Sequence, residues 1–255
     1  MQLHCDTSIA DRYTSQTQRS RVLSEAWFRS NAYCLSCEGD SLHATAANTK
    51  ATDFICPICG QAYELKAFRI RPTKTLVDGA YSSLMARIHN GSVPTLMMLE
   101  RSEEWEVQSL TAIHPLFLTP NVVEQRKPLS PTARRAGWVG CNIRLDRIAS
   151  DAKIEVIGQG RQNSVILVRE SFRKFEGLKN ISLGMRGWAT LTLQAIRGLR
   201  RETFTLRDLY EREGRFAEAY PKNRNIRPKI RQQLQVLRDL GYLAFLGGGE
   251  YRLTV

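Results

Sequence analysis

At 255 residues the chain is long enough for one large or two smaller domains, and 42% hydrophobic with 24% charged residues is ordinary for a globular protein. This composition excludes a fibrous protein and wholesale disorder. Lys and Arg number 37 against 25 Asp and Glu, which gives a net charge of +12. The positive charge favours a polyanionic partner, with nucleic acid as the first choice.

The segment Met1–Asp6 has neither the basic start nor the apolar core of a signal peptide, and no stretch approaches the roughly 20 apolar residues of a membrane span. A membrane-surface protein would need a basic amphipathic terminal helix or a lipidation motif, and neither is evident. We therefore expect a soluble cytoplasmic protein without a membrane partner. In that reducing compartment, the six cysteines favour metal binding over disulfides.

The first 183 residues combine helical and strand patterns. Apolar residues at helical spacing and short alternating runs indicate, in chain order, a helix over 20–28, a helix over 78–89, and strands over 96–100 and 105–110. Residues 124–140 hold two prolines, two glycines and one Trp without a clear period, so they are predicted to form a basic loop. The mixture of elements predicts an α/β (α+β) domain over residues 1–183.

The remaining residues, 184–255, form the more basic part, with fourteen Lys and Arg against seven Asp and Glu, a net of +7. Their pattern predicts helices near 186–198, 205–213 and 227–240, then strands over 242–246 and 250–253 around three glycines. Three helices followed by a hairpin are typical of a winged-helix DNA-binding domain. We therefore predict a domain boundary near Leu183.

Two cysteine pairs, Cys34-x2-Cys37 and Cys56-x2-Cys59, are separated by eighteen residues, which is a spacing typical of a four-cysteine zinc site. Four sulfur ligands complete a tetrahedron and leave no position for water or substrate, so this Zn²⁺ would be structural. The alternative is four cysteines that are buried or paired by chance.

Short strands are predicted on either side of the second cysteine pair, over 51–55 and 61–66, with the CPICG turn between them as a hairpin connection. Such a hairpin brings Asp53 near Glu64, and Glu64 and Lys66 project from the same face of their strand. Carboxylates suit Mg²⁺, and a neighbouring lysine can orient water or neutralise charge during phosphodiester hydrolysis. The alternative is a solvated strand face with an ion pair.

In the tail, Pro228 suits the first turn of the third helix, and Ile230, Leu234, Leu237 and Leu240 fall on one face as a predicted core stripe. The flank and outer face of this helix, with the segment before it, supply side chains that can contact bases or phosphates. These candidates are Asn223, Asn225, Arg227, Arg231, Gln235 and Arg238. An ordinary solvated basic face is the alternative.

The basic loop carries Arg134 and Arg135 shortly before Trp138, and a Trp in such a place can stack on or wedge against a base. The opposing interpretation is that Trp138 packs on its own domain.

Asp53 followed by Glu64-Leu65-Lys66 resembles the signature of the PD-(D/E)xK nucleases, with Thr52 where that signature has Pro. The segments 125–143 and 229–239 resemble the DpnI-like methyl-directed (type IIM) restriction endonucleases, and the similarity spans the chain. The resemblance implies a zinc-containing PD-(D/E)xK domain and a C-terminal winged helix in a bacterial enzyme. It also implies Mg²⁺-dependent cleavage of double-stranded DNA at GATC sites with N6-methyladenine, and it makes Trp138 a candidate for contact with the methylated base.

The leading hypothesis is a methyl-directed type II restriction endonuclease of a restriction system, with Asp53 and Glu64 holding Mg²⁺ and Lys66 assisting; no obligatory protein partner is evident. A zinc-containing winged-helix transcription regulator without catalysis is the second hypothesis. A repair nuclease that acts at mismatches or lesions is the third.

Overall fold

The structure is a computed structural model that describes residues 1–46 and 52–254. Contacts divide the chain into two compact units. The first comprises residues 1–72, 93–115 and 151–173, and the second comprises 73–92, 116–150 and 174–255. The expected strand over 51–55 begins at Ala51, which lies outside the described residues, as does Val255 at the end of the expected tail domain.

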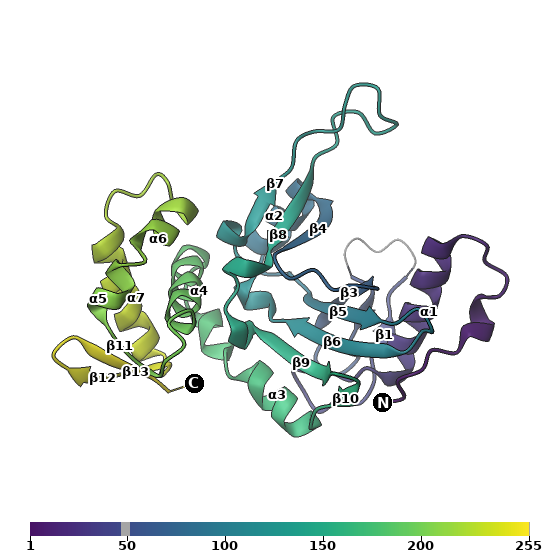
Figure 1. Cartoon of the computed structure of the whole chain (residues 1–255), viewed down its shortest axis with the longest axis horizontal. Coiled ribbons are helices and arrows are strands. Elements are labelled where there is room, and N and C mark those ends of the chain that lie inside the picture. Colours follow the sequence, from purple (N-terminus) through teal and green to yellow (C-terminus); the bar gives the residue numbers. More distant parts are fainter. Residues whose placement is uncertain (47–51, 255) are drawn as a thin grey trace. The chain divides into compact units, whose positions relative to one another are not determined.

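The first unit is built on one seven-stranded sheet (Figure 1). Its strands, in sheet order, are β1 (His43–Ala44), β2 (Phe54–Ile55), β3 (Ala62–Phe68), β5 (Thr95–Arg101), β6 (Val107–Ile113), β9 (Lys153–Gly158) and β10 (Arg161–Gln162). The pair β3–β5 is parallel, and the other neighbours are antiparallel. The helices of this unit are α1 (Gln16–Asn31), α3 (Val165–Arg173) and the 3-10 helix η1 (Thr7–Ala10).

Helices α1 and α3 contribute apolar side chains to a core shared with the sheet. Phe28 of α1 packs on Phe54 of β2 with ring centroids 4.9 Å apart, and Phe172 of α3 is buried in the same cluster. Each large apolar side chain removed from water contributes roughly 1.5–3 kcal/mol, so this core holds both helices on the sheet. The predicted helix over 20–28 and the predicted strand over 96–100 are confirmed with longer bounds. The strand predicted over 105–110 is confirmed with shifted bounds, since β6 begins at Val107 and ends at Ile113.

The second unit holds a three-stranded sheet, whose strands in sheet order are β4 (Thr75–Ala80), β8 (Gly140–Arg144) and β7 (Val123–Gln125). Helix α2 (Tyr81–His89) directly follows β4 in the chain. The predicted helix over 78–89 was wrong at its start, because residues 78–80 belong to β4 and pair with β8. The spacing of apolar residues within one segment cannot reveal that part of the segment pairs with a strand about sixty residues later in the chain. Short 3-10 helices lie at Pro115–Phe117, Pro120–Val122, Leu145–Arg147, Ser150–Ala152 and Glu176–Asn180.

Residues 126–139 connect β7 to β8 as a long arm that extends beyond its sheet (Figure 1). The predicted loop is present, but the residues nearest β7 and β8 continue the backbone pairing of these two strands. Arg126 N donates to the Gly140 carbonyl at 3.0 Å, and Leu129 N donates to the Trp138 carbonyl at 2.9 Å. These bonds hold the two sides of the arm together.

The C-terminal part of the second unit has the winged-helix layout (Figure 1). Its elements are α4 (Leu183–Arg197), β11 (Thr203–Thr205), α5 (Leu206–Tyr210), α6 (Glu213–Ala219), α7 (Ile226–Asp239), β12 (Leu243–Gly247) and β13 (Glu250–Leu253). The strand β13 lies between β11 and β12. The single helix predicted over 205–213 was wrong: β11 ends in this stretch, and two helices, α5 and α6, take its place.

The core stripe of α7 is confirmed, because Ile230, Leu234 and Leu237 are buried, and Leu240 is half-buried. Trp188 of α4 stacks on Tyr220 with ring centroids 4.0 Å apart, which packs α4 against the end of α6. The boundary near Leu183 stays a prediction, since contacts group residues 116–150 with the tail. Arg147 Nη2, for example, lies 2.6 Å from a Glu218 oxygen. Among the described residues, every helix is too short or too polar to cross a membrane.

Candidate active site and nucleic-acid interface

The four predicted zinc ligands come together in the first unit. All four sulfur atoms lie within 4.8 Å of one another; Cys34 Sγ is 3.5 Å from Cys59 Sγ, and Cys37 Sγ is 3.6 Å from Cys56 Sγ. These separations exceed a disulfide bond and match the edges, about 3.8 Å, of a tetrahedron with Zn–S distances near 2.3 Å. The donor set therefore fits zinc, and the cluster could hold that ion.

The surroundings of the cluster suit thiolate ligands. Gly39 N donates to Cys37 Sγ at 3.4 Å, and the Tyr63 hydroxyl donates to Cys34 Sγ at 3.3 Å. Burial raises the pKa of Tyr63, so this hydroxyl stays protonated and able to donate. A Cβ atom at Gly39 would lie 3.1 Å from Cys56 Sγ, so the loop needs glycine at this close approach. Such outer contacts orient metal ligands.

Helix α3 fastens the cysteine loop through Arg169, whose side chain is only 9% exposed. Its guanidinium donates to the Cys34 carbonyl and to the Gly39 carbonyl, both at 3.0 Å, and pairs with Glu38 at 2.6 Å. The fork of donors in arginine allows one side chain to satisfy both carbonyls and the carboxylate. Sequence inspection missed this residue because it lies far along the chain from the cysteines.

The hairpin predicted around the second cysteine pair is present. Phe54 of β2 pairs with Tyr63 of β3 in antiparallel register, and Cys56 N donates to the Gln61 carbonyl at 2.9 Å across the turn. Gly60 has a φ of 74°, a left-handed conformation that glycine adopts without strain and that lets this tight turn close. The cysteine turn therefore sets the register of the two strands that carry the acidic residues.

Asp53 lies just before β2, beside the backbone of β3. Its backbone N donates to the Tyr63 carbonyl at 2.9 Å, and its carboxylate Oδ2 accepts from Leu65 N at 2.8 Å. The carboxylate is thus held against the residue that stands between Glu64 and Lys66. The pair Lys66 Nζ–Glu64 Oε1 is 2.6 Å long, and the two side chains are 25% and 13% exposed. The structure brings the three predicted residues to one place on the sheet.

Glu25 of α1 adds a third acidic side chain that sequence inspection missed. Burial raises the pKa of Glu25 above its ordinary value of 4.5, Arg21 lowers it, and the neighbouring charge of Asp53 raises it. This electrostatic interaction links Glu25 to Asp53, the residue just before β2. No local signal marks this residue, since it reaches the hairpin through the packing of α1 on the sheet.

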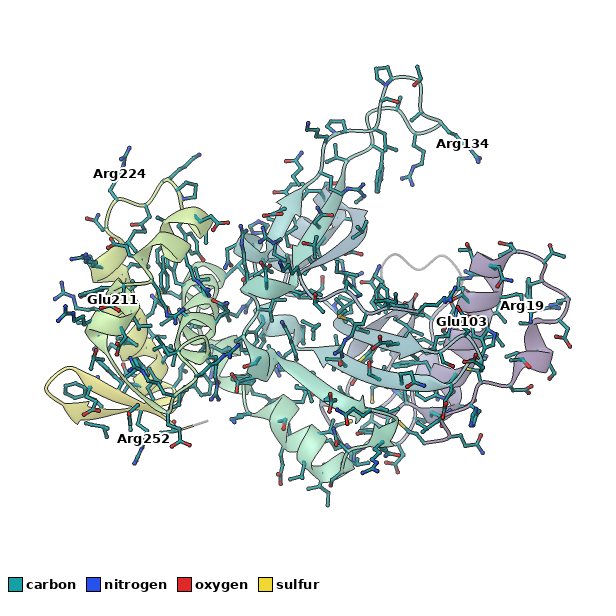
Figure 2. All side chains as sticks on the ribbon, in the orientation of Figure 1. Arg19, Glu103, Arg134, Glu211, Arg224 and Arg252 are labelled. Atoms are coloured by element: carbon teal, nitrogen blue, oxygen red, sulfur yellow. The ribbon has the colours of Figure 1, made fainter. Side chains whose placement is uncertain are left out.

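The arm presents its basic residues around a partly covered Trp138. Figure 2 shows Arg134 projecting from the end of the arm, and its side chain is exposed. Arg135 lies over the Trp138 ring at 4.8 Å from the centroid. A Cβ atom at Gly140 would lie 2.8 Å from that ring, so the indole rests directly on the backbone of Gly140. Trp138 packs on its own arm and stays half-exposed.

The candidate residues of the winged helix lie at and before the start of α7. Asn225 is the N-cap residue, and its backbone N donates to the Asn223 side chain at 2.8 Å. Arg231 and Gln235 are exposed on the outer face of α7. Arg227 is tied within the domain, by a 2.8 Å pair with Glu213 and by stacking over the Tyr210 ring, and Arg238 pairs with Asp239.

The chain combines a mixed α/β unit with a curled sheet, a four-cysteine cluster and a C-terminal helix-turn-helix domain. This combination places it in the class of DNA-binding proteins. A model described as the Dam-replacing family (DpnI) matches residues 1–181. A second model, described as the Dam-replacing helix-turn-helix domain, matches residues 184–253. The chain therefore belongs to the DpnI, or Dam-replacing, family. Membership supports a methyl-dependent restriction endonuclease, a nuclease that acts on DNA.

Proposed function

We propose that this chain is a type II restriction endonuclease that hydrolyses both strands of double-stranded DNA at GATC sites carrying N6-methyladenine. The observation that supports this best is the Asp53 carboxylate, bonded to Leu65 N between Glu64 and Lys66. The arrangement agrees with a PD-(D/E)xK site. Family membership supports the methyl dependence, while the GATC sequence and the catalytic metal are parts of the proposal.

Asp53 and Glu64 would hold Mg²⁺, and their hard oxygen donors fit that ion. When bound, Mg²⁺ stabilises negative charge on the phosphate and lowers the pKa of an attacking water. Lys66, now paired with Glu64 at 2.6 Å, carries a positive charge that can orient the water or offset charge that develops on phosphate oxygens. Leu65 N fixes the Asp53 carboxylate in position through its 2.8 Å bond. The four cysteines would hold a structural Zn²⁺ that clamps the hairpin.

We assign substrate contacts to two regions. In the arm, Arg134 and Arg135 would contact phosphates, and Trp138 would contact the methylated adenine, whose N6-methyl group projects into the major groove. In the winged helix, the start of α7 would enter the major groove with Asn223, Asn225, Arg227, Arg231 and Gln235 as candidates. We also propose a catalytic domain over residues 1–183 and a DNA-reading domain over 184–255, acting in the bacterial cytoplasm.

The deciding test incubates the wild-type chain and Asp53→Asn with Mg²⁺ and two matched plasmids, one with and one without adenine methylation. We expect the wild type to cut only the methylated plasmid and Asp53→Asn to bind it without cutting. Equal cutting of both plasmids would contradict methyl direction. Absence of cutting with retained binding would favour the transcription regulator, and preference for mismatched duplexes would favour the repair nuclease.

A further inference from the structure

A cleft of about 860 Å³ opens on the first unit, on residues that have no part in the proposed cleavage chemistry. Three arginines from separate elements line it: Arg19 of α1, Arg69 just after β3, and Arg101 at the end of β5. Figure 2 labels Arg19 and, across from it, Glu103 of the β5–β6 turn, which also lines the cleft. Asp11 completes the charged lining.

Arg101 is a buried cation without an anionic partner. The residue is only 8% exposed. Its guanidinium donates to the Ser102 carbonyl at 3.0 Å and to the Ser20 hydroxyl at 3.2 Å. Its Nε has no hydrogen-bond partner, and no carboxylate lies within 4 Å of it among residues 1–46 and 52–254. Burial and the nearby Arg69 lower its pKa. A buried charge of this kind normally requires a counter-charge.

The residues around Arg101 do not supply this counter-charge, so a bound anion would have to supply it. Glu103 is engaged by Arg69 in an ion pair. Trp105 stacks on the Arg101 guanidinium at 3.5 Å from the ring centroid, with its backbone in the left-handed region at φ 64°. Arg19 donates to the Ala10 carbonyl at 3.1 Å and has no carboxylate within 4 Å among the described residues. Planar guanidinium groups that line one cleft suit the oxygens of a phosphate.

The position of the cleft relates it to the candidate active site. The strands β3 and β5 are parallel neighbours, and Phe68 lies opposite Glu100, so Arg69 and Arg101 follow the same edge of the sheet. Lys66 lies three residues before Arg69, about 10 Å along the strand at roughly 3.3 Å per residue. The phosphates of one DNA strand are spaced about 3.4 Å along the helix axis, so a neighbouring phosphate falls within this reach.

We propose that this cleft binds a backbone phosphate of the DNA that lies outside the recognition site, about three nucleotides from the cleaved bond. The inference rests on the proposed function, because it takes the hairpin of Asp53 and Glu64 as the place of cleavage. Arg19 and Arg101 are its anion-binding residues, and Trp105 holds the guanidinium of Arg101 in place. The contact adds affinity for duplex that continues beyond the recognition site.

The test measures DNA dissociation constants against salt concentration without divalent metal, on a short duplex limited to the recognition site and on a longer one. The variants are Arg19→Gln and Arg101→Lys, with Arg161→Gln on β10 as a control that removes one exposed charge from the same sheet. On the long duplex we expect Arg19→Gln to reduce the logarithmic salt slope by about 1, as one phosphate contact predicts. The short duplex and Arg161→Gln should show no such change.

Thermal unfolding of each variant verifies folding, and Arg19→Gln decides the outcome if Arg101→Lys fails to fold. A parallel calorimetric titration of the full chain uses orthophosphate in place of DNA. Suppose that orthophosphate binds saturably, that Arg19→Gln abolishes this binding, and that the same variant leaves the DNA salt slope unchanged. This result would overturn the DNA assignment in favour of a free phosphate compound. Unchanged results in both experiments would overturn the site. A wild type that binds both duplexes but never cuts would instead contradict the proposed function.

Discussion

At the scale of single residues, the role proposed for Lys66 is the one that its surroundings make most testable. Its ammonium group lies 2.6 Å from Glu64, and its side chain is 25% exposed. A charge placed where negative charge develops commonly contributes a factor of about 10²–10³ to the rate.

We therefore expect Lys66→Met to lower the single-turnover cleavage rate by about 10²-fold or more, with little change in DNA affinity. Lys66→Arg should recover part of the rate, because the positive charge remains. The measurement is single-turnover cleavage of methylated duplex at saturating enzyme, with affinity measured separately in the absence of metal. A Lys66→Met variant with the wild-type rate would show that the lysine serves only as the ion-pair partner of Glu64.

The proximity of Asp53, Glu64 and Lys66 was predictable from the sequence because it is local. The three residues are joined by a single turn, and the cysteine spacing marks that turn. The positions of Glu25 and Arg169 could not be predicted, since each lies on a helix that is distant in the chain from the residues with which it interacts. Side-chain contacts between remote segments leave no periodic signal in the sequence.

At the scale of elements, the joint between α3 and the cysteine loop depends on Arg169. Replacing it with methionine would leave the buried Cys34 carbonyl without its donor, at a cost of about 1–3 kcal/mol. It would also remove one of two hydrogen bonds to the Gly39 carbonyl, which keeps the bond from Cys34 N, and the ion pair with Glu38. We expect Arg169→Met to lower the free energy of unfolding of the metal-loaded chain by about 2–4 kcal/mol, measured by urea denaturation.

Arg173→Met is the matched control on the same helix. Arg173 also pairs with Glu38 and donates to the Ser36 carbonyl at 3.1 Å, but its side chain is 40% exposed, so its loss should cost about 1 kcal/mol or less. Equal destabilisation by the two variants would show that the buried carbonyl contacts of Arg169 contribute no more to the joint than the exposed contacts of Arg173.

The start of α5 gives a pH-dependent contribution to stability. Thr205 N donates to Asp208 Oδ2 at 2.6 Å, Asp208 N donates to Thr205 Oγ1 at 3.3 Å, and Arg201 pairs with the same carboxylate. The backbone bond from Thr205 is the main cause that holds the pKa of Asp208 below its ordinary value of 3.8. A carboxyl with a depressed pKa in the folded state stabilises the fold above its unfolded pKa and loses this effect as pH falls through the folded pKa.

Wild type should therefore unfold at a higher temperature than Asp208→Asn between pH 7 and about 4, by a constant margin. Below about pH 4 the margin should shrink as the carboxyl is protonated. Thermal unfolding followed by circular dichroism across this range measures it. A margin that grows toward acid pH would contradict the assigned direction of the pKa shift.

The elements that the sequence misplaced have a shared cause. Residues 78–80 form a strand only because β8 pairs with them, and β11 exists only because β13 does. Helix α7 was predicted well, since its apolar stripe and its Pro228 are properties of a single helix. Elements that depend on a distant partner were those that local patterns failed to describe.

At the scale of the whole molecule, the two proposed metals would have separate tasks. The four-cysteine cluster adjoins the hairpin that carries Asp53 and Glu64, so zinc bound there would couple metal binding to folding of the first unit. Asp53 is held by its own bonds to the backbone of β3, so we expect its position not to depend on Mg²⁺.

We expect removal of zinc by a strong chelator to lower the unfolding temperature and to abolish cleavage even after Mg²⁺ is restored. Omission of Mg²⁺ alone should leave the unfolding temperature unchanged and stop cleavage reversibly. Thermal unfolding, zinc content and cleavage are measured on the same samples. An unfolding temperature unaffected by loss of zinc would show that the cluster does not stabilise the hairpin.

The bond from Leu65 N to the Asp53 side chain has a practical consequence for capturing the protein on intact DNA. The carboxylate occupies the place of a backbone carbonyl in the ladder, so this side chain contributes to strand pairing in addition to the metal binding proposed for it. Asparagine retains a carbonyl oxygen that can accept this bond, whereas alanine leaves Leu65 N without an acceptor. Asp53→Asn is therefore the better inactive form for capturing intact DNA, and Asp53→Ala should confound lost turnover with a loosened hairpin.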